Sequence, residues 1–174
     1  IPEYEALLAS NIEEYERLTR MLENMLFLAR ADNAQVALHS DSISVDLELK
    51  RIAGYFEGMA DEIGVALEVD AAGALIADAI LFRRAVSNLV SNALRYTPSG
   101  GHVTIRGHEQ VPDKFVVAVS NPGNGIPPEH LPRIFDRFYR VDDSRGESQS
   151  SSGLGLAIVK SIVTLHGGSV QAES

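Results

Sequence analysis

The order of helical and strand patterns after residue 45 most limits the folds open to this chain. Apolar residues recur at helical spacing in residues 46–62, 78–96 and 153–165. Between and after them, alternating runs predict strands at 65–69, 75–77, 103–105, 115–119 and 169–173. Because this alternation lacks strict strand–helix–strand regularity, it predicts an α+β fold, a two-layer α/β sandwich whose mixed sheet has helices on one face.

Cap and turn residues set the expected helix ends. Asp46 and Asp78 are placed as N-caps, since an aspartate side chain accepts hydrogen bonds from the first free N–H groups of a helix. Gly64 ends one helix, and Pro98 with the glycines after it ends the next. The polar stretch 39–44 is interpreted as part of a connection.

Residues 2–31 form one long helical pattern ahead of the alternating part, roughly 45 Å in length at the rise of an α-helix. No second helix of comparable length follows to cover its apolar stripe. The helix either packs on its own domain or joins an intermolecular bundle, and the persistence of the three-and-four spacing favours the bundle.

Composition excludes several classes of function. The formal net charge of −9 opposes broad contact with nucleic acid or an anionic membrane. The 174 residues include no cysteine, which removes disulfides, thiol catalysis and zinc–thiolate sites. No apolar run reaches the about 18 residues of a membrane span, and no signal peptide is visible. The chain starts at Ile1 and stops within an expected strand, so we expect a fragment that is not itself membrane-inserted.

Two asparagines lie one turn apart inside the helix expected at 78–96, although asparagine is a poor helix-interior residue. Asn88 and Asn92 share a face that Arg95 and Tyr96 continue. Amide oxygens suit Mg²⁺, a guanidinium suits phosphate, and a phenol ring offers a flat surface to a base. A solvated helix face explains the stripe equally well when it is taken alone.

Glycines mark two further segments. Gly123 and Gly125, in Asn-Pro-Gly-Asn-Gly-Ile-Pro, let the backbone turn sharply and approach a flat ligand. Gly153 and Gly155 stand where the last helix begins, so free amides and the helix dipole there favour phosphate. Ordinary turns remain the alternative for each segment.

The stretch between these glycine segments has two parts. Residues 134–140 carry aromatic anchors and two arginines, and residues 142–152 are polar and serine-rich. A segment that is tethered at both ends and buries little of itself behaves as a mobile lid.

Taken in order, these segments resemble the boxes of the ATP-binding domain of sensor histidine kinases, within the superfamily of gyrase, Hsp-type chaperones, kinases and MutL. The likeness covers about residues 34–174 and implies the Bergerat ATP-binding fold. The matching segments are 88–96 (N box), 121–126 (first glycine box), 134–140 (F box), 151–156 (second glycine box) and 166–168 (a closing glycine element).

Residues 1–32 resemble the second helix of the dimerisation and phosphoacceptor bundle of these kinases, and residues 33–174 the catalytic domain with its last strand truncated. The sequence of residues 15–32 and 138–142 is most similar to that of heavy-metal sensors of the copper/silver type. The resemblance implies a homodimer through the N-terminal helix, a cognate response regulator as partner, and the cytoplasmic portion of a bacterial inner-membrane protein.

The resemblance also implies roles at a site for ATP and Mg²⁺. Asn92, assisted by Asn88, would hold the metal, and Arg95 and Arg140 would meet phosphates as the remaining catalytic residues. Tyr96 would pack beside adenine. The other cofactor-binding positions are Asn121, which would read the adenine amino group, and Gly123, Gly125, Ile126, Gly153, Leu154, Gly155 and Leu156.

Two positions depart from the family pattern. Asn121 stands where the family usually has aspartate, so the charge assistance of that hydrogen bond is lost and nucleotide binding should weaken by on the order of 1 kcal/mol. Ser151 replaces the first glycine of its box, and serine resists positive φ. The lid is therefore expected to be disordered or differently folded without nucleotide.

The expected activity is transfer of the ATP γ-phosphoryl group to a histidine outside this chain, since none of its five histidines lies in a motif like His-Glu-Leu-Arg-Thr-Pro. One alternative is an ATP hydrolase of the same superfamily. Those enzymes use a glutamate at the first N-box position, where Asn88 cannot act as a base. The other alternative is a non-catalytic module that binds nucleotide or a partner.

Overall fold

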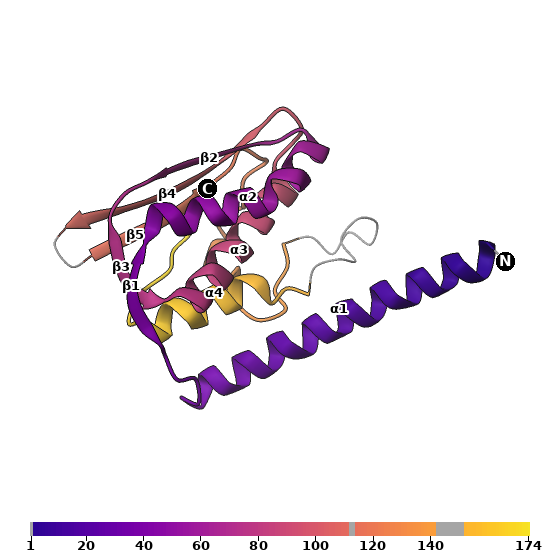
Figure 1. Cartoon of the computed structure of the whole chain (residues 1–174), viewed down its shortest axis with the longest axis horizontal. Coiled ribbons are helices and arrows are strands. Elements are labelled where there is room, and N and C mark those ends of the chain that lie inside the picture. The colour runs from indigo at the N-terminus through magenta and orange to yellow at the C-terminus, as the bar shows by residue number, and fades with distance from the viewer. Residues whose placement is uncertain (1, 112–113, 142–151) are drawn as a thin grey trace.

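The computed structural model describes residues 2–111, 114–141 and 152–174, and its elements confirm the predicted mixture of helices and strands (Figure 1). In chain order they are α1 (Pro2–Asp32), β1 (Ser40–Ser44), α2 (Val45–Ile63), β2 (Ala66–Ala71), β3 (Ala74–Asp78), α3 (Ala79–Tyr96), β4 (His102–Val111), β5 (Lys114–Ser120), a 3₁₀ turn (Leu131–Arg133) and α4 (Gly155–Leu165).

The strands of the described residues form two sheets. In the larger one, β4 lies between β2, to which it is parallel, and β5, to which it is antiparallel. The smaller sheet pairs β1 antiparallel to β3. The prediction of a mixed sheet that contains an antiparallel hairpin is confirmed.

Helices α2 and α3 lie on one face of the three-stranded sheet and form the main core with it (Figure 1). Fully burying an aliphatic or phenylalanine side chain stabilises the fold by about 1.5–3 kcal/mol, so this layer supplies most of the stability. Its largest contributors are Val45, Leu49, Ile52 and Phe56 of α2, Phe82, Val86, Val90 and Leu94 of α3, and Val103 and Ile105 of β4.

A second hydrophobic cluster lies between α4 and α3. One side chain of α1 is buried in this cluster. Leu28 of α1 is buried there, with Met21 and Phe27 of the same helix packed against its edge. The cluster is completed by Leu81, Ala85, Leu154, Ala157, Ile158 and Ile162. The C-terminal turns of α1 therefore pack on the α/β part.

The rest of α1 projects away from the other elements (Figure 1). Its large apolar side chains are exposed, from Tyr4 at 73% to Leu18 at 42%. The last turns of this helix therefore contact their own chain, whereas its longer N-terminal part has an uncovered apolar face, and the intermolecular bundle stays a prediction. None of the helices in the described ranges has the length and apolar content needed to span a membrane.

Three local predictions are wrong. The stretch 39–44, interpreted as part of a connection, holds strand β1. The other residues of this strand are polar and Ile43 alone is buried, so the strand shows no alternation of apolar and polar residues. Residues 169–173 lie in no strand ladder, and the end of the chain instead bonds through the Ser174 hydroxyl to the N–H of Ile126. Asp46 is not a cap, because α2 begins at Val45 and the Asp46 carboxylate pairs with Lys50 at 2.9 Å.

Candidate functional site

Helix α3 carries the asparagine stripe, and its start is fixed by Asp78. This carboxylate accepts hydrogen bonds from the N–H groups of Ile80 and Leu81, both at 3.0 Å, and of His39 at 3.1 Å. Burial raises the pKa of Asp78, but these three bonds and the nearby His166 outweigh burial, so the pKa is lowered. The Nε2 atom of His166 also accepts the Asp78 N–H at 3.0 Å.

Asn88 connects α3 to the start of α4. Its Nδ2 donates to the carbonyl oxygen of Arg84 at 2.8 Å, which leaves its Oδ1 directed at Gly155. A Cβ atom at Gly155 would lie 3.1 Å from that Oδ1, tighter than most Cβ contacts. The structure therefore brings the first residue of the stripe and the second glycine segment together, and the missing side chain of Gly155 permits the approach.

The first glycine segment meets the other end of α3. A Cβ atom at Gly123 would lie 3.0 Å from the carbonyl oxygen of Tyr96 and 3.7 Å from Nδ2 of Asn121. That Nδ2 donates to the carbonyl of Pro122 at 3.1 Å, so the Oδ1 of Asn121 keeps its capacity to accept. The ring of Tyr96 is 62% exposed beside this turn.

Gly153 and Phe138 close the two ends of the stretch expected to form the lid. The N–H of Phe138 donates to the carbonyl of Gly153 at 2.9 Å, and both residues have positive φ, 61° and 67°. Positive φ is uncommon outside glycine. A Cβ atom at Gly153 would come 2.8 Å from Cα of Phe138, so this junction requires glycine. Residues 142–151 of the lid, Ser151 included, lie outside the described residues.

The remaining predicted site residues differ in their exposure to solvent. Asn92 is half-buried, whereas Arg95 and Arg140 are exposed; Gly125 is an exposed turn residue, followed by the half-buried Ile126. The side chain of Leu154 is fully buried in the second cluster, so only its backbone could meet a ligand, and Leu156 is half-buried.

The amide side chains of the stripe fit a metal whose other oxygen ligands come from a bound phosphate compound. Among the described residues, no group of three or more histidine, aspartate or glutamate side chains could hold a cation. A divalent ion at the stripe would depend on amide oxygens, water and ligand phosphates, and Mg²⁺ takes oxygen ligands and is commonly bound through substrate phosphates.

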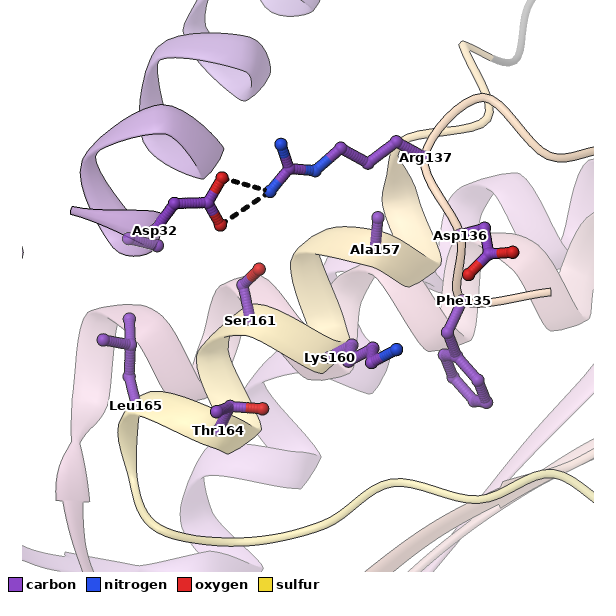
Figure 2. Close-up of a pocket in the computed structure, with 10 residues that line it drawn as sticks. Asp32, Phe135, Asp136, Arg137, Ala157, Lys160, Ser161, Thr164 and Leu165 are labelled. Atoms are coloured by element: carbon purple, nitrogen blue, oxygen red, sulfur yellow. Dashed lines mark hydrogen bonds and ion pairs between the residues drawn. The ribbon is translucent and has the colours of Figure 1, made fainter. Parts of the chain in front are cut away.

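Two of the clefts among the described residues border α1. One of about 470 Å³ lies between α1 and α3 and includes Asn88. The other, of about 550 Å³, lies between the end of α1, residues 135–137 and α4 and holds none of the predicted site residues (Figure 2). At its edge, Nη2 of Arg137 contacts both carboxylate oxygens of Asp32, at 2.6 and 2.7 Å (Figure 2).

Sequence reasoning missed Arg84, although it stands four residues before Asn88 and extends the same stripe by one turn. Its guanidinium contacts Asn24 and Phe27 of α1. It also missed the pair of Asp32 and Arg137, which are 105 residues apart in the sequence. The helical spacing could have suggested Arg84, whereas no local signal marks the second pair.

Residues 77–174 match the family described as histidine kinase-, DNA gyrase B-, and HSP90-like ATPase. Over 172 residues the chain is 47% identical to the sensor protein IrlS of Burkholderia pseudomallei, covering 99% of this chain and 37% of that protein. It is 48% identical over 174 residues to the sensor histidine kinase CusS of Escherichia coli K12, covering 99% and 36%. The chain thus spans about a third of the length of these curated relatives.

Solved structures share the fold. Full-length ShkA in complex with AMPPNP has a TM-score of 0.83 at 24% identity, with 93% of this chain and 34% of that chain covered. The histidine kinase AdeS of Acinetobacter baumannii has a TM-score of 0.77 at 24% identity, with 92% and 73% covered.

Proposed function

Because this chain belongs to the family of histidine kinase-, DNA gyrase B- and HSP90-like ATPases, and forms an ATP-binding catalytic domain of the sensor histidine kinase type, we propose that it transfers the γ-phosphoryl group of ATP to a histidine. The acceptor would lie on a bundle helix outside these residues. Residues 1–32 would be the neighbouring helix of that bundle and residues 33–174 the catalytic domain.

One observation carries the proposal: Nδ2 of Asn88 is held by the Arg84 carbonyl, and Oδ1 of Asn88 faces Gly155 at the start of α4. Glycines at 123 and 155 keep clear the space that a side chain would fill. Asn92 and Asn88 would supply amide oxygens to Mg²⁺, and Arg95 and Arg140 would donate to phosphate oxygens. Mg²⁺, when bound, would neutralise the charge of the phosphates.

The adenine end would be recognised beside the first glycine turn. Tyr96 offers its exposed ring to the base. Oδ1 of Asn121 would accept a hydrogen bond from the adenine amino group while its Nδ2 stays on the Pro122 carbonyl. This neutral hydrogen bond is weaker than a charged one, so we expect ATP to bind less tightly than it would with a carboxylate at position 121.

Transfer is favoured over hydrolysis at this site. An amide at position 88 cannot take a proton from water, so water activation lacks a base there. Phosphoryl transfer to a positioned histidine needs alignment and charge neutralisation more than a base.

The partners follow from the family and from α1. A second copy would cover the exposed apolar residues of α1 to form a homodimer, and a response regulator would receive the phosphoryl group. The names of the relatives IrlS and CusS support a sensor protein as the parent. This part would lie on the cytoplasmic side of a bacterial inner membrane, where ATP is available. Similarity to heavy-metal sensors suggests a metal-responsive system.

Nucleotide binding is tested by thermal unfolding with ATP, with and without a chelator. We expect Mg-ATP to raise the midpoint, because a ligand at 100 times its Kd stabilises by about 2.7 kcal/mol. Asn92→Ala should abolish the shift, whereas Ser91→Ala, at the exposed neighbouring position, should keep it. Equal protection of the parent chain and Asn92→Ala would exclude the metal role of Asn92.

The activity is tested by mixing the chain with a separately produced acceptor-helix domain and ATP labelled in the γ-position. Label on the acceptor histidine supports the kinase. Release of free phosphate alone supports a hydrolase, and nucleotide binding with neither product supports a non-catalytic module.

A further inference from the structure

The guanidinium of Arg84 makes two different contacts with α1. Its Nη2 donates to Oδ1 of Asn24 at 2.9 Å, and its Cζ lies 4.2 Å from the centroid of the Phe27 ring. The side chain is half-buried in this contact, and burial lowers its pKa, with the charge of Glu23 acting in the opposite direction. The guanidinium of Arg84 is partly desolvated and is held by both an amide and a ring face. These two contacts fix the orientation of α1 relative to α3 as well as the distance between the two helices.

The backbone of the same residue holds the asparagine stripe. The Arg84 carbonyl accepts the hydrogen bond from Nδ2 of Asn88, and Oδ1 of Asn88 faces Gly155. One residue therefore connects Asn24 and Phe27 of α1 to the first asparagine of the stripe, without an intervening flexible loop.

An open cleft of about 470 Å³ lies along this connection. Arg20, Glu23 and Asn24 line it from α1, and Arg84, Ser87 and Asn88 line it from α3. It leads from the expected phosphate end of the nucleotide site to the helix beside which the acceptor histidine would lie. The spacing of its two walls would set how far the phosphoryl group must move.

We propose that Arg84 is a positioning residue for phosphoryl transfer, holding α1 at a fixed distance and angle from Asn88 so that the terminal phosphate faces the acceptor. The inference rests on the proposed function and adds a residue to it. Packing alone does not require this arginine, because Leu28 already anchors α1 in the apolar cluster, and an apolar side chain of similar size is often as stabilising as a buried charge. A misplacement of about 1 Å can cost on the order of 100-fold in rate.

The adjacent Arg83 provides a matched control. It lies on the same helix, and its Nη1 pairs with Glu48 of α2 at 2.9 Å, whereas the guanidinium of Arg84 bonds to Asn24 of α1. Arg83→Met and Arg84→Met remove the same charge one residue apart. A difference between them therefore reports the contact with α1.

The experiment measures two quantities for each variant: the Kd for Mg-ATP, and the single-turnover rate of label transfer to the acceptor-helix domain at saturating ATP. Arg84→Met should lower the rate tenfold to 100-fold and change the Kd less than twofold. Arg84→Lys should recover part of the rate, because it keeps the charge over Phe27 but loses the planar fork. Arg83→Met should leave both quantities near those of the parent chain.

A further variant protects the test against misfolding. Asn24→Ala removes the hydrogen bond from the α1 side without altering α3, and combined with Arg84→Met it should slow transfer no more than Arg84→Met alone. The inference is overturned if Arg84→Met transfers at the parent rate, if Arg83→Met slows transfer equally, or if the whole loss lies in the Kd. A parent chain that binds Mg-ATP but labels no histidine would instead refute the proposed function.

Discussion

Helices α1 and α3 carry the same kind of sequence pattern and use it differently. Both repeat apolar residues at intervals of three and four, the spacing of an amphipathic helix. In α3 seven of these residues are buried between the sheet and α4. In α1, Leu28 is the one buried residue among the side chains that the structure describes. The periodicity thus identifies a face that needs cover, but not whether the same chain provides it.

This difference separates a helix whose apolar face is buried in its own chain from a helix whose apolar face is mostly exposed. The apolar face of α3 stabilises the chain itself, whereas the exposed face of α1 would contribute only when another helix covers it. Burial is worth about 25 cal/mol for each Å² of apolar surface removed from water, so covering this face would yield a substantial association energy. The same type of substitution should therefore have different consequences in the two helices.

The largest effect is expected for matched leucine truncations. Leu94 of α3 is 2% exposed and Leu22 of α1 is 61% exposed. Leu94→Ala should lower the free energy of unfolding by about 2–5 kcal/mol through lost burial and a cavity. Leu22→Ala should change it by less than about 0.5 kcal/mol in urea unfolding of the dilute chain.

Raising the protein concentration sharpens this test. If a second copy covers α1, the cost of Leu22→Ala should increase with concentration, because dimerisation then contributes to stability. Equal costs for the two truncations in the dilute chain would refute the contrast between the helices.

The next effect concerns the one place where α1 behaves like α3. Leu28 is 2% exposed in the cluster with α4, and the nearby Leu26 is 57% exposed. Leu28→Ala should cost about 2 kcal/mol, the lower end for core leucines, because a helix end held at few points can adjust to the cavity. Leu26→Ala serves as the control, and hydrogen exchange of the last turns of α1 should increase in Leu28→Ala alone.

The fold could be read from the sequence where local signals agreed. For α3, the spacing, the Asp78 cap and the stop at Pro98 coincide, and the helix runs from Ala79 to Tyr96. β1 escaped prediction because one buried residue, Ile43, gives no alternation to detect. The strand expected at 169–173 had the alternation but no ladder in the described structure. A strand depends on a neighbour, which a local pattern does not report.

The candidate site likewise has residues that the local sequence predicts and contacts that depend on tertiary packing. Asn88 and Gly155 could be chosen from residue chemistry and spacing, because helix geometry and glycine freedom are local properties. Their approach, and the link from Arg84 to Asn24 and Phe27, depend on how α1 and α4 pack on α3. The burial of Leu154 likewise follows from the second cluster and not from its position in a glycine segment.

A smaller effect is expected at the start of α3. Asp78→Ala should lower the free energy of unfolding at pH 7 by about 1–2 kcal/mol, the usual cost of a lost N-cap. The folded state lowers the pKa of Asp78, so the carboxylate stabilises the fold above its unfolded pKa of about 3.9 and less as pH falls through the folded pKa. The deficit of Asp78→Ala should therefore shrink below about pH 4 in urea titrations.

Asp78→Asn is the control for that test, since asparagine caps helices well but does not titrate. It should retain most of the stability at pH 7. A deficit of Asp78→Ala that stayed constant from pH 7 to pH 3 would show that the charge of Asp78 contributes nothing.

The smallest effect is expected where α1 ends, at the pair of Asp32 and Arg137 (Figure 2). Both side chains are nearly half exposed, and exposed ion pairs contribute about 0–1 kcal/mol. Asp32→Asn should therefore lower the free energy of unfolding by less than about 1 kcal/mol at low salt, and the difference should vanish near 1 M salt, where the Debye length is about 3 Å. Leu28→Ala should keep its cost in that salt, because apolar burial is not screened. A salt-independent loss in Asp32→Asn would mean that the end of α1 is held by packing around Asp32 and not by its charge.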